Sequence, residues 1–226
     1  EIHYTNNLRL VASCIGVING INKYYDPSYV PHFNAFEFKK DSKEYCAIIH
    51  PIKTEGLLFE LDAKRICDWL YSNGFVESAI EHGMEKEYIL HLSEESSEYV
   101  QIKTLIHSFS HGLIKQSSIH TGLDEGTCSE MLFVNNCAFL IYSTSNINIG
   151  GFEYLFKYSL LDWFRELKYS IEDCTFDPVC KMDGGKCFSC MYLQEHVCTE
   201  FNQNLSRLTM IGGGEYQNGF WNLSGE

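Results

Sequence analysis

Apolar and polar residues follow one another along the chain in patterns that predict both strands and helices. Residues 10–18, 45–50 and 56–62 are apolar runs with the composition of strands, and the first predicts a buried strand. The third leads directly into residues 63–71, where apolar side chains recur at helical spacing and Asp62 is placed to cap the helix. The first third of the chain therefore predicts a sheet and a strand-to-helix unit.

The clearest helical period lies in the middle of the chain. From Tyr99 to Ile114, apolar residues recur every three or four positions, which predicts a helix with one apolar stripe. The preceding residues 81–98 are mostly polar and rich in Glu, as in a surface connection. We therefore expect an N-terminal sheet-containing region over residues 1–98 and a C-terminal region over residues 99–226. The two regions can pack against each other as one unit.

The second half of the chain predicts a hairpin and two further helices. Residues 130–134 and 137–143 are strand-like and are separated by two Asn residues that suit a turn. A pair of glycines then precedes a long amphipathic helix through residues 155–167, and residues 199–211 again have a helical pattern. These elements predict an α+β or α/β fold with a mixed sheet, flanking helices and a C-terminal loop region.

Composition limits the classes of function. Hydrophobic residues make up 45% of the 226 residues, and no apolar run approaches the roughly 18 residues of a membrane span, so we expect a soluble cytoplasmic protein. A formal net charge of −13 opposes tight binding to a phosphate backbone and suits a basic protein partner, which can itself hold nucleic acid. The chain begins at Glu1, which fits either the C-terminal part of a longer product or a processed form.

Five of the ten cysteines fall within residues 174–198, with the spacing C-x5-C-x6-C-x2-C-x7-C. Two thiolates separated by two residues can turn back onto one tetrahedral zinc ion, and two more from flanking loops complete a closed shell. Asp and Gly residues between them supply the turns that such a loop needs. We predict a structural zinc site with the following ligands, Cys174 being the alternate because it ends the preceding helix: Cys180, Cys187, Cys190 and Cys198.

Two further interpretations concern the clustered pair Cys187 and Cys190 and the five cysteines outside the cluster. A thiol redox pair at Cys187 and Cys190 needs a thioredoxin-like setting and leaves the other clustered cysteines unexplained. The five scattered cysteines are most simply small buried hydrophobes in a reducing compartment: Cys14, Cys46, Cys67, Cys128 and Cys137.

His107 and His111 share one helical face, a spacing that can chelate a metal. A zincin needs Glu directly after the first His, and Ser108 stands there instead, which favours a hydrogen-bonded histidine pair at a packed interface. The competing hypothesis is a metal-dependent hydrolase or nuclease that uses both histidines, with Glu130, beside the turn at Gly150. The sequence contains no nucleotide-binding loop and no nucleophile elbow, so we assign no catalytic residue.

The order of these motifs resembles the cysteine-rich, helicase-associated zinc-binding domain family. That family includes the C-terminal domain of mitomycin-repair-type helicases and a branch in DISARM phage defence, to which this chain is most similar. Ser108 departs from the Thr that usually follows the first His. The resemblance covers most of the chain and is carried by residues 54–61, His107 and His111, Glu130, residues 140–143, Gly150 and Gly151, residues 174–180, 187–190 and 195–198, and residues 204–207.

The resemblance implies a non-catalytic partner of a superfamily 2 helicase in bacterial antiviral defence. DNA would then be engaged by the assembled complex and not by this chain alone. The helicase subunit of the same system is the partner that the resemblance implies, and no membrane is expected to take part.

Overall fold

The computed structural model describes residues 1–19, 32–38, 44–145 and 149–223. The chain divides into two compact units: unit 1 comprises Glu1–Asn7 and Thr54–Glu226, and unit 2 comprises Leu8–Lys53. The two longest strands, β1 (Ile2–Cys14) and β4 (Ile48–Glu60), each have residues in both units. The expected boundary between residues 98 and 99 lies inside unit 1, and the corresponding division into regions stays a prediction.

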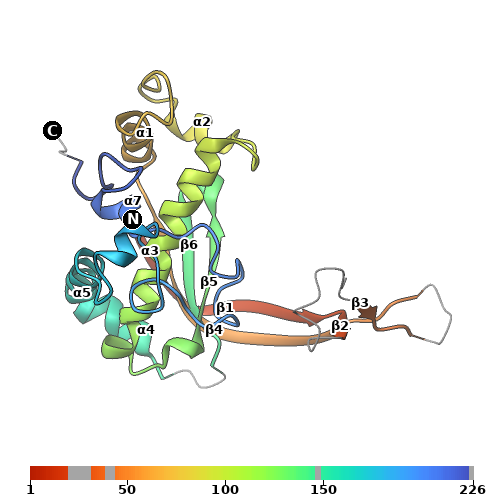
Figure 1. Cartoon of the computed structure of the whole chain (residues 1–226). Helices are drawn as coiled ribbons and strands as arrows, with labels where there is room; N and C mark the ends of the chain where they lie inside the picture. Colours follow the sequence, from red (N-terminus) through yellow and green to blue (C-terminus); the bar gives the residue numbers. More distant parts are fainter. Residues whose placement is uncertain (20–31, 39–43, 146–148, 224–226) are drawn as a thin grey trace. The chain divides into compact units, whose positions relative to one another are not determined.

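The sheet of unit 1 has the strand order β1-β4-β6-β5 (Figure 1). Strand β6 (Ala138–Ser143) pairs antiparallel with β4 on one side and with β5 (Cys128–Phe133) on the other. Strands β5 and β6 form the predicted hairpin, and Cys137 closes its turn with a φ of 54°. An antiparallel sheet with flanking helices and a C-terminal group of cysteines confirms the predicted fold class.

Helix α1 (Ala63–Ser72) follows β4 directly, as the sequence predicts. The side chain of Asp62 accepts a hydrogen bond of 2.8 Å from the backbone N–H of Arg65, and this contact fixes the first turn. The stretch expected to be a polar connection contains a short helix, α2 (Glu85–Leu90), and its Ile89 is fully buried.

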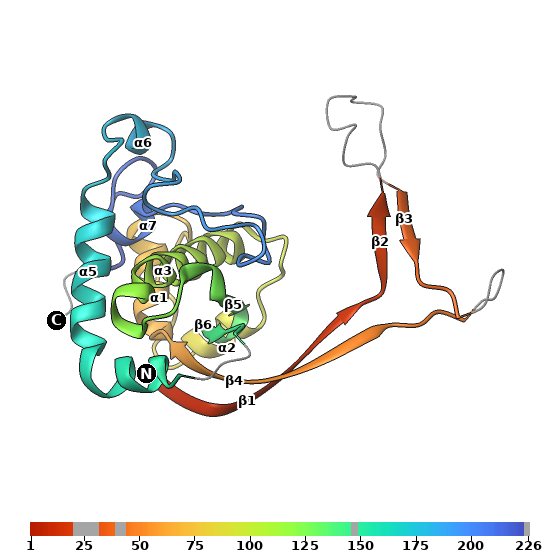
Figure 2. The same ribbon diagram turned by 90° about the horizontal axis from the view of Figure 1, so that it is seen from below.

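Helix α3 (Ser97–Thr121) is the centre of unit 1. It contacts both β5 and β6 on one side and α5 (Leu160–Glu172) on another, and the C-terminal loops lie against it in both views (Figures 1 and 2). Helix α5 approaches closely at Gly112, where a Cβ atom would stand 2.4 Å from Leu167 Cδ1. Burial of α3 on several sides explains why polar residues as well as apolar ones lie in the core.

The glycine turn leads into helix α4 (Gly151–Tyr154), which continues through a π-helical turn, η4 (Leu155–Ser159), into α5. The predicted long helix is therefore present, with one widened turn. Gly151 packs against the end of α3, because a Cβ there would lie 2.6 Å from the backbone oxygen of Thr121.

The predicted helix over residues 199–211 is wrong except for its end. Only α7 (Leu208–Ile211) is helical there, and the one other helix of residues 174–223 is α6 (Val179–Met182). Phe201, Asn202 and Asn204 have positive φ angles of 53°, 56° and 50°, which a right-handed helix excludes. Two of the three are Asn, which adopts this conformation more readily than most residues.

Unit 2 contains the antiparallel pair β2 (Gly16–Asn19) and β3 (His32–Ala35) and parts of β1 and β4. The apolar run from residue 10 onward spans the end of β1 and the start of β2, which are separated at Ile15, and it is not buried: Val11, Ile15 and Val17 are all exposed. No helix in the part of the chain that the structure describes has the length and apolar character to cross a membrane.

Replacement of Asp62 by Ala should lower the free energy of unfolding by about 1 kcal/mol, because the first turn of α1 loses its cap. Asp68→Ala on the same helix removes only an exposed ion pair with Lys64 and should cost less than about 0.5 kcal/mol. Urea unfolding of the two variants checks the difference, and equal losses would contradict the cap.

Candidate metal centre

The structure brings four cysteines together, and we call this group the cysteine centre: Cys174, Cys180, Cys187 and Cys190. Their sulfur atoms all lie within 4.8 Å of one another. The Sγ–Sγ separations are 3.4 Å for Cys174 and Cys187, and 3.6 Å both for Cys180 and Cys190 and for Cys187 and Cys190.

These separations are informative about chemistry. A disulfide would hold two sulfurs at about 2.05 Å. A tetrahedral zinc ion with bonds of about 2.3 Å would hold its four sulfurs about 3.8 Å apart. All ten cysteines are free thiols, and the four of the cysteine centre have nearly the spacing of a metal shell. The group can therefore hold a metal ion.

Short local structures position each thiol. Cys174 follows α5 directly, Cys180 lies on α6, and Cys187 begins a tight turn that ends at Cys190. Gly184 and Gly185 have φ angles of 78° and 70°, as expected from the Asp-Gly-Gly sequence. The loops predicted around the ligands are thus present.

The electrostatic setting differs among the thiols of the cysteine centre. Burial by itself would raise the pKa of Cys187, but hydrogen bonds from the backbone N–H groups of Cys190 and Ser189 and from neighbouring thiols outweigh it, so the pKa is lowered. Burial raises the pKa of Cys180 to about 11. Cys187 is therefore the member that most readily becomes the thiolate form that binds metal.

Cys198 does not belong to this group, and Cys174 takes the place that the spacing assigned to it. Residues 191–198 run along α3 and β5: His111 Nδ1 lies 2.9 Å from the carbonyl oxygen of Met191, and Ser129 donates to the carbonyl of Val197 at 2.8 Å. This path carries Cys198 to the middle of α3. The backbone N–H of Cys174, in contrast, donates to Asp177, which folds the Cys174 loop back towards Cys180.

A buried arginine, which the spacing of the cysteines did not indicate, holds the loop that begins at Cys174. Arg207 is fully buried, and its guanidinium donates to the carbonyl of Ile171 at 2.6 Å and to the carboxylate of Asp177. Burial would raise the pKa of Asp177, but the hydrogen bond from Arg207 outweighs it and lowers the pKa. The only signal for Arg207 in the sequence is its place in the Asn-Leu-Ser-Arg motif of the family resemblance.

Cys198 lies in a second group, which we call the histidine cluster: His107, His111, Glu130 and Cys198. Glu130 Oε1 lies 3.0 Å from His107 Nε2 and 2.9 Å from His111 Nε2, and Cys198 Sγ lies 3.2 Å from His107 Nε2. Both imidazoles and Glu130 are fully buried. The two histidines pack against each other in the interior, with ring centroids 4.3 Å apart.

The glycine turn is not beside this cluster. Gly151 packs on Thr121, which is ten residues beyond His111 on α3, or about 15 Å at 1.5 Å per residue. The arrangement in which both histidines act beside Gly150 is therefore wrong, and the turn serves close packing between helices.

The scattered cysteines divide into two kinds. Cys67, Cys128 and Cys137 are buried, as expected, and burial raises the pKa of Cys128 to about 11. Cys14 and Cys46 are exposed, which corrects the expectation for these two. Both lie in unit 2, where the apolar strand residues are exposed as well.

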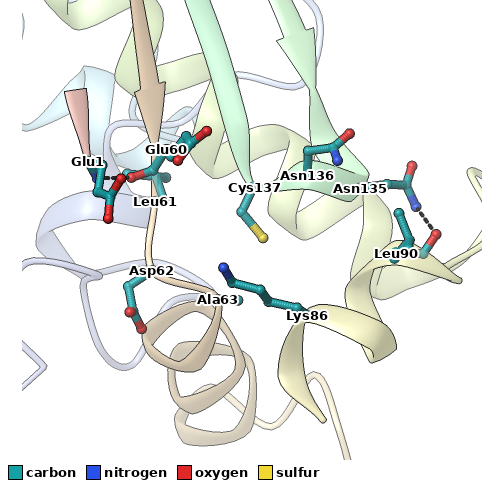
Figure 3. Close-up of a pocket in the computed structure, with 10 residues that line it drawn as sticks. All are labelled: Glu1, Glu60, Leu61, Asp62, Ala63, Lys86, Leu90, Asn135, Asn136 and Cys137. Carbon is teal, nitrogen blue, oxygen red and sulfur yellow. Dashed lines mark hydrogen bonds between the residues drawn. The ribbon is translucent and has the colours of Figure 1, made fainter. Parts of the chain in front are cut away.

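A pocket of about 440 Å³ is separate from both groups (Figure 3). It lies where β4 ends and α1 begins, and Lys86 points into it beside Cys137. None of the residues that line it belongs to the cysteine centre or the histidine cluster. The pocket therefore adds no ligand to either.

The fold and the centre define a class of protein in which an antiparallel sheet and a central helix carry a loop-rich segment organised by cysteines. Among curated proteins, the chain is similar to the DISARM protein DrmB of Bacillus paralicheniformis, with 26% identity over 179 residues. The match covers 70% of this chain and 31% of DrmB, so the chain spans about a third of that relative. This supports a relation to DrmB. No family model matches the chain.

Replacement of Arg207 by Met should lower the free energy of unfolding by about 3–5 kcal/mol, because Asp177 loses its buried partner and two carbonyl groups lose their donor. Arg165→Met removes an exposed pair with Asp162 and should cost below about 1 kcal/mol. Thermal and urea unfolding of both variants measure this, and a small loss for Arg207→Met would contradict the proposed role of the buried pair.

Proposed function

We propose that this chain is a non-catalytic accessory part of a DISARM-like phage-defence complex in the bacterial cytoplasm. In this proposal it docks on a superfamily 2 helicase and helps the assembled complex to engage DNA. The observation that carries the proposal is the similarity to the DISARM protein DrmB over 70% of the chain.

We propose zinc as the ion of the cysteine centre. Four thiolates in a tetrahedral arrangement suit zinc, and a shell completed by four protein ligands leaves no position for a substrate. Three of the four cysteines are buried and the fourth is partly buried, which fits a closed structural site. Zinc bound there would fix the loops between α5 and α7, and the residues of both groups all fall within the proposed metal-binding region 99–226.

Unit 2 offers a surface for a protein partner. Ile48 and Ile49 are neighbours on β4, so their side chains face opposite sides of the strand, yet they are 65% and 62% exposed. Val11 and Ile15 are exposed to a similar degree. Apolar side chains left in water on several strands are typical of a surface that a partner covers.

The charge of the chain supports a division of labour within the complex. A formal net charge of −13 repels the phosphate backbone of DNA and attracts a basic protein surface. The helicase would therefore supply most contacts to DNA, and this chain would supply contacts to the helicase. Hydrolysis at His107 and His111 is not part of this proposal, because both side chains are fully buried and a substrate would have no access to them.

Replacement of Cys180 by Ala should remove one zinc ion per chain and lower the yield of folded protein, because zinc binding contributes directly to folding. Cys137→Ala is the matched control, since it changes a buried thiol outside both groups and should keep the full metal content. Elemental analysis of protein purified without added metal measures both. Unchanged zinc in Cys180→Ala would contradict the assignment.

The docking surface is tested by Ile48→Asp combined with Ile49→Asp in the full chain, tagged in its native host. Capture of the helicase should fall by about tenfold or more, as for loss of an interface hot spot, while the melting temperature stays the same. Leu161→Asp, an equally exposed apolar residue on α5, should leave capture intact. Absence of a helicase from the captured wild-type complex would contradict the proposed function.

A further inference from the structure

The histidine cluster collects four potential ligand atoms from three segments of the chain. Two Nε2 atoms come from α3, a carboxylate oxygen comes from β5, and a sulfur comes from the loop before α7; all lie within 4.8 Å of one another. Cys198 is 2% exposed and the other three members are fully buried. Ionisable groups buried this deeply are paired with one another or coordinate a metal ion.

The tautomers of both histidines follow from their other ring nitrogen. His107 Nδ1 lies 3.3 Å from the carbonyl oxygen of Asn204, and His111 Nδ1 lies 2.9 Å from the carbonyl oxygen of Met191. A carbonyl oxygen only accepts, so each Nδ1 carries the hydrogen. In the neutral imidazole each Nε2 then presents a lone pair to Glu130, and this is the arrangement of histidines that bind a metal through Nε2 and donate from Nδ1 to a carbonyl.

The other two members have matching surroundings. Glu130 Oε2 is buried and has no hydrogen-bond partner among the described residues, although Oε1 is close to both imidazoles. Cys198 Sγ accepts a hydrogen bond of 3.3 Å from the backbone N–H of Asn202, a contact that stabilises a thiolate. Glu130 and Cys198 therefore present negative charge to the middle of the cluster. Neutral imidazoles supply no positive charge to balance it.

We propose that the histidine cluster is a second metal site, in which His107 Nε2, His111 Nε2, the Glu130 carboxylate and Cys198 Sγ bind one zinc ion. Two neutral imidazoles, one carboxylate and one thiolate together carry a charge of −2, which balances a divalent ion and would leave the buried site neutral. Zinc accepts nitrogen, oxygen and sulfur ligands together in a tetrahedral shell.

The geometry needs only small adjustment for this ion. Zinc bonds of about 2.0–2.3 Å would separate the ligand atoms by about 3.3–3.7 Å. The present separations of 2.9, 3.0 and 3.2 Å are shorter by about half an ångström, so the side chains would move apart slightly. Because four protein ligands fill the shell and all are buried, the ion would be structural.

The alternative is that protons on the imidazoles, and not a metal ion, bring the positive charge to this cluster. If the imidazoles were both protonated, the same four side chains would form a buried network of ion pairs with no metal. The two cases differ in metal content and in the atoms around the metal, so they can be separated in the unaltered protein.

The first test is elemental analysis together with zinc X-ray absorption on the whole wild-type chain, purified without added metal. The proposal predicts two zinc ions per chain. Their averaged shell should contain sulfur at about 2.3 Å and nitrogen or oxygen at about 2.0–2.1 Å, with five sulfurs among eight ligands from the two groups. One zinc per chain with a shell of sulfur alone would overturn the proposal and leave the cysteine centre in place.

Variants then assign the second ion. Glu130→Gln and Cys198→Ala should each lower the content from two zinc ions to one, and the ion that remains should have only sulfur ligands. Cys187→Ser should also leave one ion, but with a shell rich in nitrogen and oxygen. If a variant fails to fold, the zinc X-ray absorption data on the wild-type chain still show whether the second site binds zinc. These experiments do not depend on capture of a helicase. A negative result for the second metal site is therefore distinct from a negative result for the proposed function.

Discussion

Hydrogen bonds between polar side chains of α3 and backbone groups, and not backbone ladders, join residues 174–207 to α3. In this segment, all of which the structure describes, the one helix is α6, with four residues. The buried face of α3 carries His107, Ser108 and His111, and each would cost free energy in the core without a partner. The segment supplies those partners: the carbonyls of Asn204 and Met191 and the N–H of Ser206.

This constraint links the cysteine centre to the histidine cluster. The chain leaves the first group at Cys190, and the next residue, Met191, already contacts His111. Further on, Asn204 contacts His107, and Arg207 three residues later holds Asp177 in the loop of the cysteine centre. The two groups are therefore joined by one continuous segment of the chain, and the same segment buries apolar side chains such as Met191 and Leu205 in the core.

Local patterns predicted the parts of the fold that local interactions decide. The strand and capped helix around Asp62 and the hairpin closed at Cys137 follow from periodicity and turn chemistry, and both are present. The C-x2-C pair likewise predicted a turn that brings Cys187 and Cys190 together, and their sulfurs lie 3.6 Å apart. Spacing alone did not distinguish Cys174 from Cys198, because that choice depends on the path of residues 191–198 along α3.

The other errors also come from tertiary contacts. Residues 199–211 have a helical pattern, but Asn202 instead bonds both backbone groups of Leu193, and this requires a different backbone. The apolar run that begins at residue 10 predicted a buried strand, whereas Val11, Ile15 and Val17 are exposed. An apolar strand can be covered by its own chain or by a partner, and composition does not separate the two cases.

We propose that metal bound by the cysteine centre and the histidine cluster, and not regular secondary structure, holds residues 174–207 in place. Hydrogen exchange of the whole chain, measured by mass spectrometry before and after chelation of bound metal, tests it most directly. We predict that amides of residues 174–207 lose protection on chelation while those of α1 and the β5–β6 hairpin keep theirs. Unchanged protection of residues 174–207 after complete metal removal would contradict the claim.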